Sequence, residues 1–430
     1  MNINTIVTHE NPDLDAILSV LLMKKFGSQL FPGVESAPVT FSSANTLPGN
    51  KTSKQLLNEG VMALDIGGGR FDTHPVGTNE NIEKREKCAA SIVAEELSLT
   101  DNLQWKSLIE YTRLQDTKGH SLYSKNYLHH LVSLNTILFG LKYIEPGSEN
   151  MLRQGTELFE AIAACPAEKM DDPELIKKLI SDYFEIPEHE ELLQQSWMEN
   201  LRKWLALFKE NPVLAFSDIE LDKVVSLKTI VNGAYISFGN DYEKTYAFFS
   251  VCLNALIRRE QEWFIAVAEF KEKAKIIRVN NLNIVSIESE NGLTIKVSRS
   301  EVRSDIFLYR NPANGATTVF VHRNGPLNMF RINRLAGLIR YIEARISGDK
   351  IVSENLQLTG THCGWFLHQS GNLLIKGSDK ALDFIPSKIP LDDLQAIICF
   401  FIDQKKNFSA PEKYLGYILE YENPAFKRAK

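Results

Sequence analysis

The residues best suited to chemistry gather near the N-terminus, in the stretch His9-Glu-Asn-Pro-Asp13-Leu-Asp15. One imidazole and the carboxylates of two aspartates lie here, at the junction between a short β-branched run and a helix-like pattern. A loop at the carboxyl end of a strand can bring such side chains together around a cation. Mixed oxygen and imidazole ligands suit Mn²⁺ or Mg²⁺. The alternative interpretation is a polar loop in which Asn11 or Asp13 caps the helix.

Two further segments carry carboxylates where a predicted strand or helix ends. Asp65 ends an apolar run and is followed by three glycines and then by Asp72-Thr73-His74. The glycines would let the backbone turn sharply and approach a phosphate closely. Asp116 lies between an apolar helix and a turn. Each of these residues could instead be an ordinary turn residue at the end of its element.

Together the three segments supply about enough ligands for two divalent ions that share a bridging carboxylate. The predicted metal ligands are His9, Asp13, Asp15, Asp65, His74 and Asp116. Two such ions would polarise a bridging water and brace an in-line displacement at phosphorus. The chain has no Walker A loop, no G-x-G-x-x-G and no G-x-S-x-G, so the motifs of those nucleotide-binding and hydrolase classes are absent.

The elements that must position these residues alternate between strand and helix. Strands are predicted at 5–7, 38–43 and 60–65, and helices at 13–26 and 87–97. This alternation predicts an α/β domain with a mostly parallel sheet, which we place at residues 1–149.

The rest of the chain changes character twice. Residues 150–275 show helical patterns and are predicted to form a helical connector. Residues 276–430 are predicted to form a smaller C-terminal α/β or α+β domain. Its predicted strands are IIRV, NIVSIES, LTIKVSR, IFLYR, TTVFVHR and one strand between Gly360 and Gly371, and its predicted helices are NRLAGLIRYIEARI and PLDDLQAIICFFID.

Composition sets broad limits on the class of protein. The 430 residues are 44% hydrophobic and 24% charged, which is typical of a globular chain. Five widely spaced cysteines without a C-x-x-C pair argue against a disulfide framework and a structural zinc site. The N-terminus lacks a signal-peptide pattern, and its apolar stretch 16–23 is too short to span a bilayer. A cytoplasmic protein without a membrane partner is expected.

The net charge of −6 conceals a basic segment. Residues 275–345 contain eleven basic and five acidic residues, and nine of the basic residues are arginines. Arginine is well shaped for bidentate phosphate contacts. The alternative interpretation is that these basic residues form a solvated strand surface.

The ordered motifs resemble those of the DHH phosphoesterase superfamily. HENPDLDA, LDIGG, FDTHP and LQDTKG are similar to its four motifs, and KCAASIVAEEL to its following helix. The superfamily includes manganese-dependent inorganic pyrophosphatases, RecJ-type exonucleases and small-oligonucleotide phosphodiesterases. Within it the chain looks closest to the MYG1 family of metal-dependent nucleases, which WFLHQSGNLLIKGS also resembles near the C-terminus.

The resemblance implies a DHH-type domain that hydrolyses phosphodiester bonds, as an exonuclease on RNA or short oligonucleotides, by a metal-bound hydroxide. Asp65 would bridge two Mn²⁺ ions, or alternatively Mg²⁺; His9 and Asp13 would hold one ion, and Asp15, Asp116 and His74 the other. The implied catalytic residues are Asp65 and His74, with Asp72 supporting the ligands. The implied substrate-binding residues are Arg70, His368, Gly371 and Lys376.

One departure from the family pattern concerns the third motif. Thr73 stands where the family has the first histidine of Asp-His-His, which normally ligates a metal. His74 could replace that ligand or contact phosphate, and one of the two ions could be lost. The competing hypotheses are a pyrophosphatase-like phosphoanhydride hydrolase and a degenerate, non-catalytic nucleotide- or RNA-binding protein.

Overall fold

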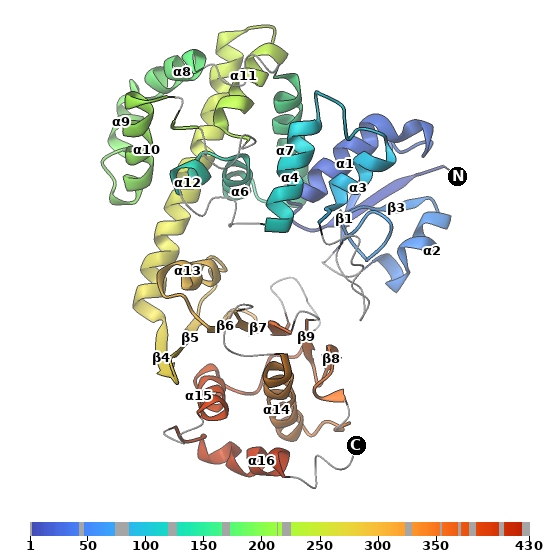
Figure 1. Ribbon diagram of the computed structural model, residues 1–430, viewed down its shortest axis with the longest axis vertical. Helices are drawn as coiled ribbons and strands as arrows, with labels where there is room; N and C mark the ends of the chain where they lie inside the picture. The colour runs from blue at the N-terminus through green and yellow to red at the C-terminus, as the bar shows by residue number, and fades with distance from the viewer. Residues whose placement is uncertain are drawn as a thin grey trace. The chain divides into compact units, whose positions relative to one another are not determined.

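The chain folds as an α/β protein that divides into two compact units. They are Met1–Gln261, unit 1, and Glu262–Lys430, unit 2 (Figure 1). The computed structural model describes residues 2–42, 47–73, 86–118, 127–165, 173–212, 214–216, 225–322, 329–352, 355–368, 371–377, 384–403 and 408–423. Within these ranges no helix combines the length and the hydropathy needed to cross a bilayer.

A three-stranded parallel sheet begins unit 1, as predicted. Its strands are β1 (Thr5–His9), β2 (Val39–Ser42) and β3 (Val61–Ala63), in the order β2-β1-β3. Because β2 and β3 flank β1 on opposite sides, the winding of the chain reverses at β1. The carboxyl end next to such a reversal is where open α/β sheets bind ligands.

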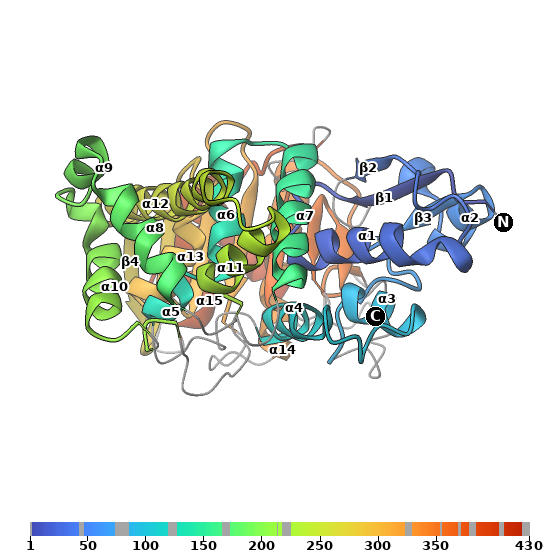
Figure 2. The same ribbon diagram turned by 90° about the horizontal axis from the view of Figure 1, so that it is seen from above.

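The first helix, α1 (Leu14–Phe26), has clear start and stop signals. Asp13 caps its N-terminus, and the N–H of Gly27 donates to the carbonyl of Met23 at its C-terminus. Residues 14–23 are all buried, because α1 packs on the sheet and on α3 (Ala89–Glu96). The alanines of α3 are fully buried and allow α3 to pack closely on α1 (Figure 2).

Unit 1 contains the predicted α/β domain, residues 1–149, and most of the predicted helical connector, residues 150–261. Its other helices include α2 (Ser53–Asn58), α4 (Lys106–Lys118), α5 (Tyr127–Leu131), α6 (Leu134–Ile144), α7 (Ser148–Ala164), α8 (Glu174–Phe184), α9 (Pro187–Leu192), α10 (Glu199–Glu210) and α11 (Leu227–Ser237), with the 3-10 turns η1 (Gly27–Gln29), η2 (Pro48–Asn50) and η6 (Ser196–Met198). Helix α12 (Tyr242–Lys273) continues from unit 1 into unit 2.

Unit 2 is built on a seven-stranded mixed sheet of order β4-β5-β6-β7-β10-β9-β8. Its strands are β4 (Lys275–Val279), β5 (Leu282–Glu288), β6 (Ile306–Arg310), β7 (Thr317–Val321), β8 (Gly360–His362), β9 (Trp365–Leu367) and β10 (Leu373–Lys376). One face is covered by α14 (Met329–Ser347) and α15 (Leu391–Ile402), and α16 (Glu412–Glu422) packs on α14. α13 (Thr294–Glu301) lies on the other face (Figure 1).

Two predicted elements of unit 2 are wrong. LTIKVSR is the helix α13 and not a strand. The reason is topological: β5 and β6 are parallel, and parallel neighbours need a crossover that a hairpin cannot supply. The single strand predicted between Gly360 and Gly371 is a hairpin of β8 and β9, which turns at Cys363 and Gly364, both with positive φ.

A buried arginine organises the same region of unit 2. The guanidinium of Arg340, on α14, is fully buried and donates to the carbonyls of Leu356, Leu358, Gly360 and Trp365 at 2.6–2.9 Å. Burial lowers the pKa of Arg340 to about 10, and the carbonyl oxygens supply the partners that a buried cation requires.

Candidate metal centre

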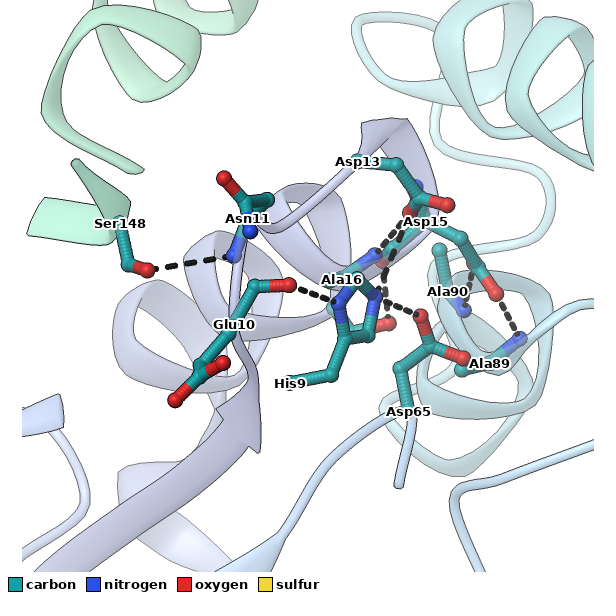
Figure 3. Close-up of polar contacts among 11 residues, drawn as sticks. His9, Glu10, Asn11, Asp13, Asp15, Ala16, Asp65, Ala89, Ala90 and Ser148 are labelled. Carbon is teal, nitrogen blue, oxygen red and sulfur yellow. Dashed lines mark hydrogen bonds and ion pairs between the residues drawn. The ribbon is translucent and has the colours of Figure 1, made fainter. Parts of the chain in front are cut away.

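Three side chains converge at the carboxyl edge of the unit 1 sheet (Figure 3). His9 ends β1, Asp13 caps α1, and Asp65 lies just beyond β3. One ligand atom from each lies within 4.8 Å of the other two. All three were predicted as metal ligands, with Asp65 bridging two ions and His9 and Asp13 holding one of them. The fold brings the three side chains together at the reversal of winding.

Hydrogen bonding fixes the orientation of the His9 ring. Its Nδ1 lies 3.0 Å from the carbonyl oxygen of Glu10, so Nδ1 must be the donor there. Its Nε2 lies 3.2 Å from Oδ2 of Asp65 and 3.9 Å from Oδ1 of Asp13. A backbone carbonyl that holds one ring nitrogen and aims the other at the site is the usual support of a metal-binding histidine.

Asp65 is held in an unusual backbone conformation. Its φ of 55° lies in the left-handed region, which is uncommon for residues other than glycine, asparagine and aspartate. Its N–H donates to the carbonyl of Phe71 at 2.9 Å, so the glycine loop 67–69 folds back on it. The carboxylate of the buried Asp72 accepts from the N–H of Gly68 at 2.5 Å. Asp72 therefore supports the glycine loop that follows Asp65, and its predicted role in supporting metal ligands stays a prediction.

The electrostatics of the group favour a cation. Burial disfavours a charge on His9, but hydrogen bonds and charges of Asp13 and Asp65 outweigh it and raise the pKa of His9 to about 11. Neighbouring groups partly desolvate the Asp13 carboxylate and oppose its ionisation, but His9 and the N–H groups of Ala16 and Asp15 lower its pKa. The Asp13 side chain is 63% exposed and that of Asp65 only 1%, so the group opens to solvent on the Asp13 side.

Asp15 has a different set of contacts. Its two carboxylate oxygens accept the N–H groups of Ala89 and Ala90, each at 2.7 Å, at the start of α3. Burial first, and then the charges of Asp116 and Asp13, raise the pKa of Asp15 to about 7. Asp15 is thus close to Asp116 but ties α1 to α3, and it does not join the group of His9, Asp13 and Asp65.

The remaining predicted residues of unit 1 are not members of that group or lie beyond the described ranges. Asp116 lies near the exposed end of α4. Arg70 forms an ion pair with Glu96 and stacks on Phe71 at 5.3 Å. Thr73 is half-buried, and His74 lies outside the described residues. Its roles as ligand and catalytic residue, and the second ion, stay predictions.

The residues of unit 2 predicted to bind substrate have structural contacts. Lys376 forms a buried ion pair with Glu343 at 3.0 Å. His368 and Gly371 close the turn between β9 and β10: the N–H of Gly371 donates to the carbonyl of His368, and that of His368 to the carbonyl of Leu373, both at 2.8 Å. A role of these residues in substrate binding stays a prediction.

Two supporting contacts have no signal in the motif itself. The hydroxyl of Ser148, at the start of α7, accepts the N–H of Asn11 at 3.1 Å, and Asn11 has a positive φ of 50° (Figure 3). The thiol of Cys88 lies close to Asp15 and acts to lower the pKa of that carboxyl, against the larger effect of burial. Both partners are far from the motif in sequence, so only the fold reveals them.

The chemistry of the donor set fits a divalent cation. One imidazole nitrogen and two carboxylate oxygens can face one point and leave further positions for water or substrate, as in ions such as Mn²⁺ and Mg²⁺. In the described part of the chain, no second group of three such side chains meets as closely. Comparison with known proteins gives no family model that matches the chain and no curated protein similar to it.

Proposed function

We propose that the protein is a metal-dependent phosphoesterase of the DHH type. The observation that carries the proposal is the convergence of His9, Asp13 and Asp65 within 4.8 Å, at the edge of the sheet where ligands bind. The order and spacing of the motifs around these three residues support the same class. Hydrolysis of a phosphodiester in RNA or a short oligonucleotide is the activity we favour.

The proposal gives each residue a definite task. His9, Asp13 and Asp65 would hold the divalent ion, which supplies Lewis acidity toward a phosphoryl oxygen and lowers the pKa of water. Glu10 holds the His9 ring through its backbone carbonyl at 3.0 Å, and Asp72 holds the loop that follows Asp65. The opening on the Asp13 side, where 63% of the side chain is exposed, leaves room for a substrate.

Hydrolysis of bis(p-nitrophenyl) phosphate and of a short RNA, with Mn²⁺ and with EDTA, tests the proposal. We expect Mn²⁺-dependent turnover. Asp13→Asn and Asp65→Asn should each reduce it at least about 100-fold, because removal of a ligand charge weakens binding of the ion. Asp101→Asn is the matched control, since the Asp101 side chain is 92% exposed. Turnover that survives both ligand substitutions would contradict the mechanism, and turnover of pyrophosphate alone would favour a phosphoanhydride hydrolase.

A non-catalytic nucleotide-binding protein is the second candidate, and Asp15 favours it. Both Asp15 oxygens accept backbone N–H groups at 2.7 Å, and Thr73 offers no imidazole, so the second ion has fewer donors than the family pattern provides. Metal analysis of purified, Mn²⁺-equilibrated protein distinguishes the two candidates. About one ion per chain, together with no hydrolysis of either substrate, would favour the binding protein.

A further inference from the structure

A sheet face in unit 2 combines rings and aliphatic side chains that are only half-buried. Side chains of β7, β10 and β9 alternate strictly: Val319, Leu374 and Leu367 point into the core under α14 and α15. The alternate positions point to the opposite face, and each is partly accessible to solvent. We call these positions the platform: Thr318, Phe320, Phe366, His368, Leu373 and Ile375.

The strand register makes the platform continuous. Phe320 lies opposite Leu373, and Ile375 lies between Thr318 and Phe366 on its two neighbours. The rings of Phe366 and His368 are 6.3 Å apart at an interplanar angle of 75°. Strands two apart in a sheet are separated by roughly 10 Å. Phe320 on β7 therefore forms one stacking position, and Phe366 on β9 with His368 just past its end forms a second, with the aliphatic side chains of β10 between them.

Positive charge borders the platform on the side of α13. The guanidinium of Arg299 lies over the Phe320 ring, 4.0 Å from its centroid. Lys296 and Arg303 lie on or next to the same helix and are exposed, as is Arg299. Glu301 is the one acidic residue between 294 and 304, and it faces Lys271 at 4.0 Å. The surroundings of Phe320 therefore suit an anionic occupant better than an apolar or cationic one.

We propose that the platform binds single-stranded nucleic acid by stacking bases on Phe320, Phe366 and His368. A sheet that presents aromatic rings next to arginine is a physical solution to this task, because every base has a π-face and every nucleotide a phosphate. Thr318 offers a hydroxyl for a base edge, and Arg299 can contact phosphate while it stacks on Phe320. The platform adds a binding site for the substrate of the proposed function, and hydrolysis of the bound strand rests on that function.

The test uses the full chain in EDTA, which separates binding from turnover. Fluorescence anisotropy of fluorescein-labelled octa-adenylate RNA measures the Kd of the wild type, Phe320→Leu, Phe366→Leu and the double variant. Leucine keeps the apolar contact but removes the π-face, so we expect about fivefold weaker binding or more for each substitution. Phe320→Trp and Phe366→Trp should retain wild-type binding, which excludes loss of folding as the cause.

The control is Phe264→Leu, because Phe264 is also a partly exposed aromatic of unit 2, 43% accessible on α12 and away from the sheet. It should leave the Kd unchanged. No binding by the wild type, or a double variant within twofold of it, would overturn the inference. Light scattering gives a further check, since a wild-type dimer that the double variant dissociates would assign the platform to a second copy of the chain.

The outcomes for the two proposals are separable. The wild type should bind the RNA in EDTA, where no ion is present to support hydrolysis. Binding without any metal-dependent hydrolysis would defeat the proposed function and support the platform. Hydrolysis with a KM that the double leucine variant does not change would defeat the platform and support the function.

Discussion

Asp13 has two tasks at the scale of single residues, and one substitution can separate them. Its Oδ1 accepts the N–H groups of Asp15 and Ala16 at 3.0 and 3.2 Å, and the same side chain belongs to the candidate metal centre. Asparagine caps helices about as well as aspartate, whereas alanine costs about 1 kcal/mol. In EDTA, urea unfolding should therefore show Asp13→Ala about 1 kcal/mol less stable than Asp13→Asn.

Calorimetric titration with Mn²⁺ completes this test. Both variants should bind the ion at least tenfold more weakly than the wild type, since both lack the carboxylate charge. Wild-type affinity in Asp13→Asn would show that Asp13 is a helix cap and nothing more.

His9 should couple ion binding to proton release. Its pKa is raised from 6.5 to about 11, so without an ion the ring is protonated at neutral pH. A divalent cation needs the unprotonated Nε2, and its binding must then release about one proton. Mn²⁺ affinity should rise with pH, by up to about tenfold per unit. Titrations at pH 7.5 in buffers of different ionisation enthalpy measure the proton count, and a count near zero would contradict this role.

The raised pKa of His9 also determines how the stability of the ion-free protein changes with pH. A histidine whose pKa is raised on folding contributes stability that is fully present below pH 6.5 and is lost as the pH rises toward 11. The contribution comes from Asp13 and Asp65. His9→Gln should therefore flatten the decline of the unfolding free energy above pH 7 in EDTA.

The residues of the site could be predicted from sequence only in part. The spacing of His9 and Asp13, and the position of Asp65 at a strand end, were enough to predict the three side chains that converge. The carboxylate of Asp15 belongs to the same motif, but its partners Ala89 and Ala90 lie more than 70 positions later. The local sequence around Asp13 and Asp15 does not show which of the two carboxylates accepts the N–H groups at the start of α3.

At the scale of elements, close helix contacts depend on glycine. A Cβ at Gly233 on α11 would lie 1.8 Å from the carbonyl oxygen of Ala161 on α7, so the backbones touch there. Gly233→Ala should lower the unfolding free energy by at least about 2 kcal/mol, measured by urea unfolding, because the helices must separate. Gly416→Ala on α16 is the control: its Cβ meets open space, and it should stabilise by up to about 1 kcal/mol. Equal effects of the two substitutions would contradict the packing argument.

The elements themselves were largely predictable where periodicity and end signals agree, as in α1. α13 shows the limit. Leu293, Ile295 and Val297 alternate like a strand, yet Thr294, Val297 and Ser298 are the buried positions of a helix. The parallel pairing of β5 and β6 decides the matter, and pairing is a property of the sheet that no seven-residue window contains.

At the scale of the whole molecule, the two units have separate hydrophobic cores. The larger core gathers residues between Ile3 and Ile257, and the core of unit 2 gathers residues between Val279 and Tyr421. We expect two transitions in scanning calorimetry. Mn²⁺ at 100 times its Kd should stabilise only the unit 1 transition, by about 2.7 kcal/mol. One transition, or an equal shift of both, would contradict independent units.

The basic segment 275–345 also has a different meaning in the whole molecule. Lys275 pairs with Asp392, Arg334 with Glu422 and Arg345 with Glu420. These partners lie outside the segment, so its excess charge of +6 is partly balanced within unit 2. The composition showed the excess, but only the fold shows which acidic side chains outside the segment balance part of it.

The carbonyl contacts of Arg340 have a consequence for the order of folding. Segment 356–365 takes its shape from one side chain of α14, through four carbonyls, and the hairpin of β8 and β9 contributes only three residues to each strand. So short a hairpin cannot persist alone. It must form after α14 has docked, late on the folding pathway. Arg340→Met should therefore speed unfolding and leave the folding rate of unit 2 nearly unchanged. Stopped-flow kinetics can measure both rates.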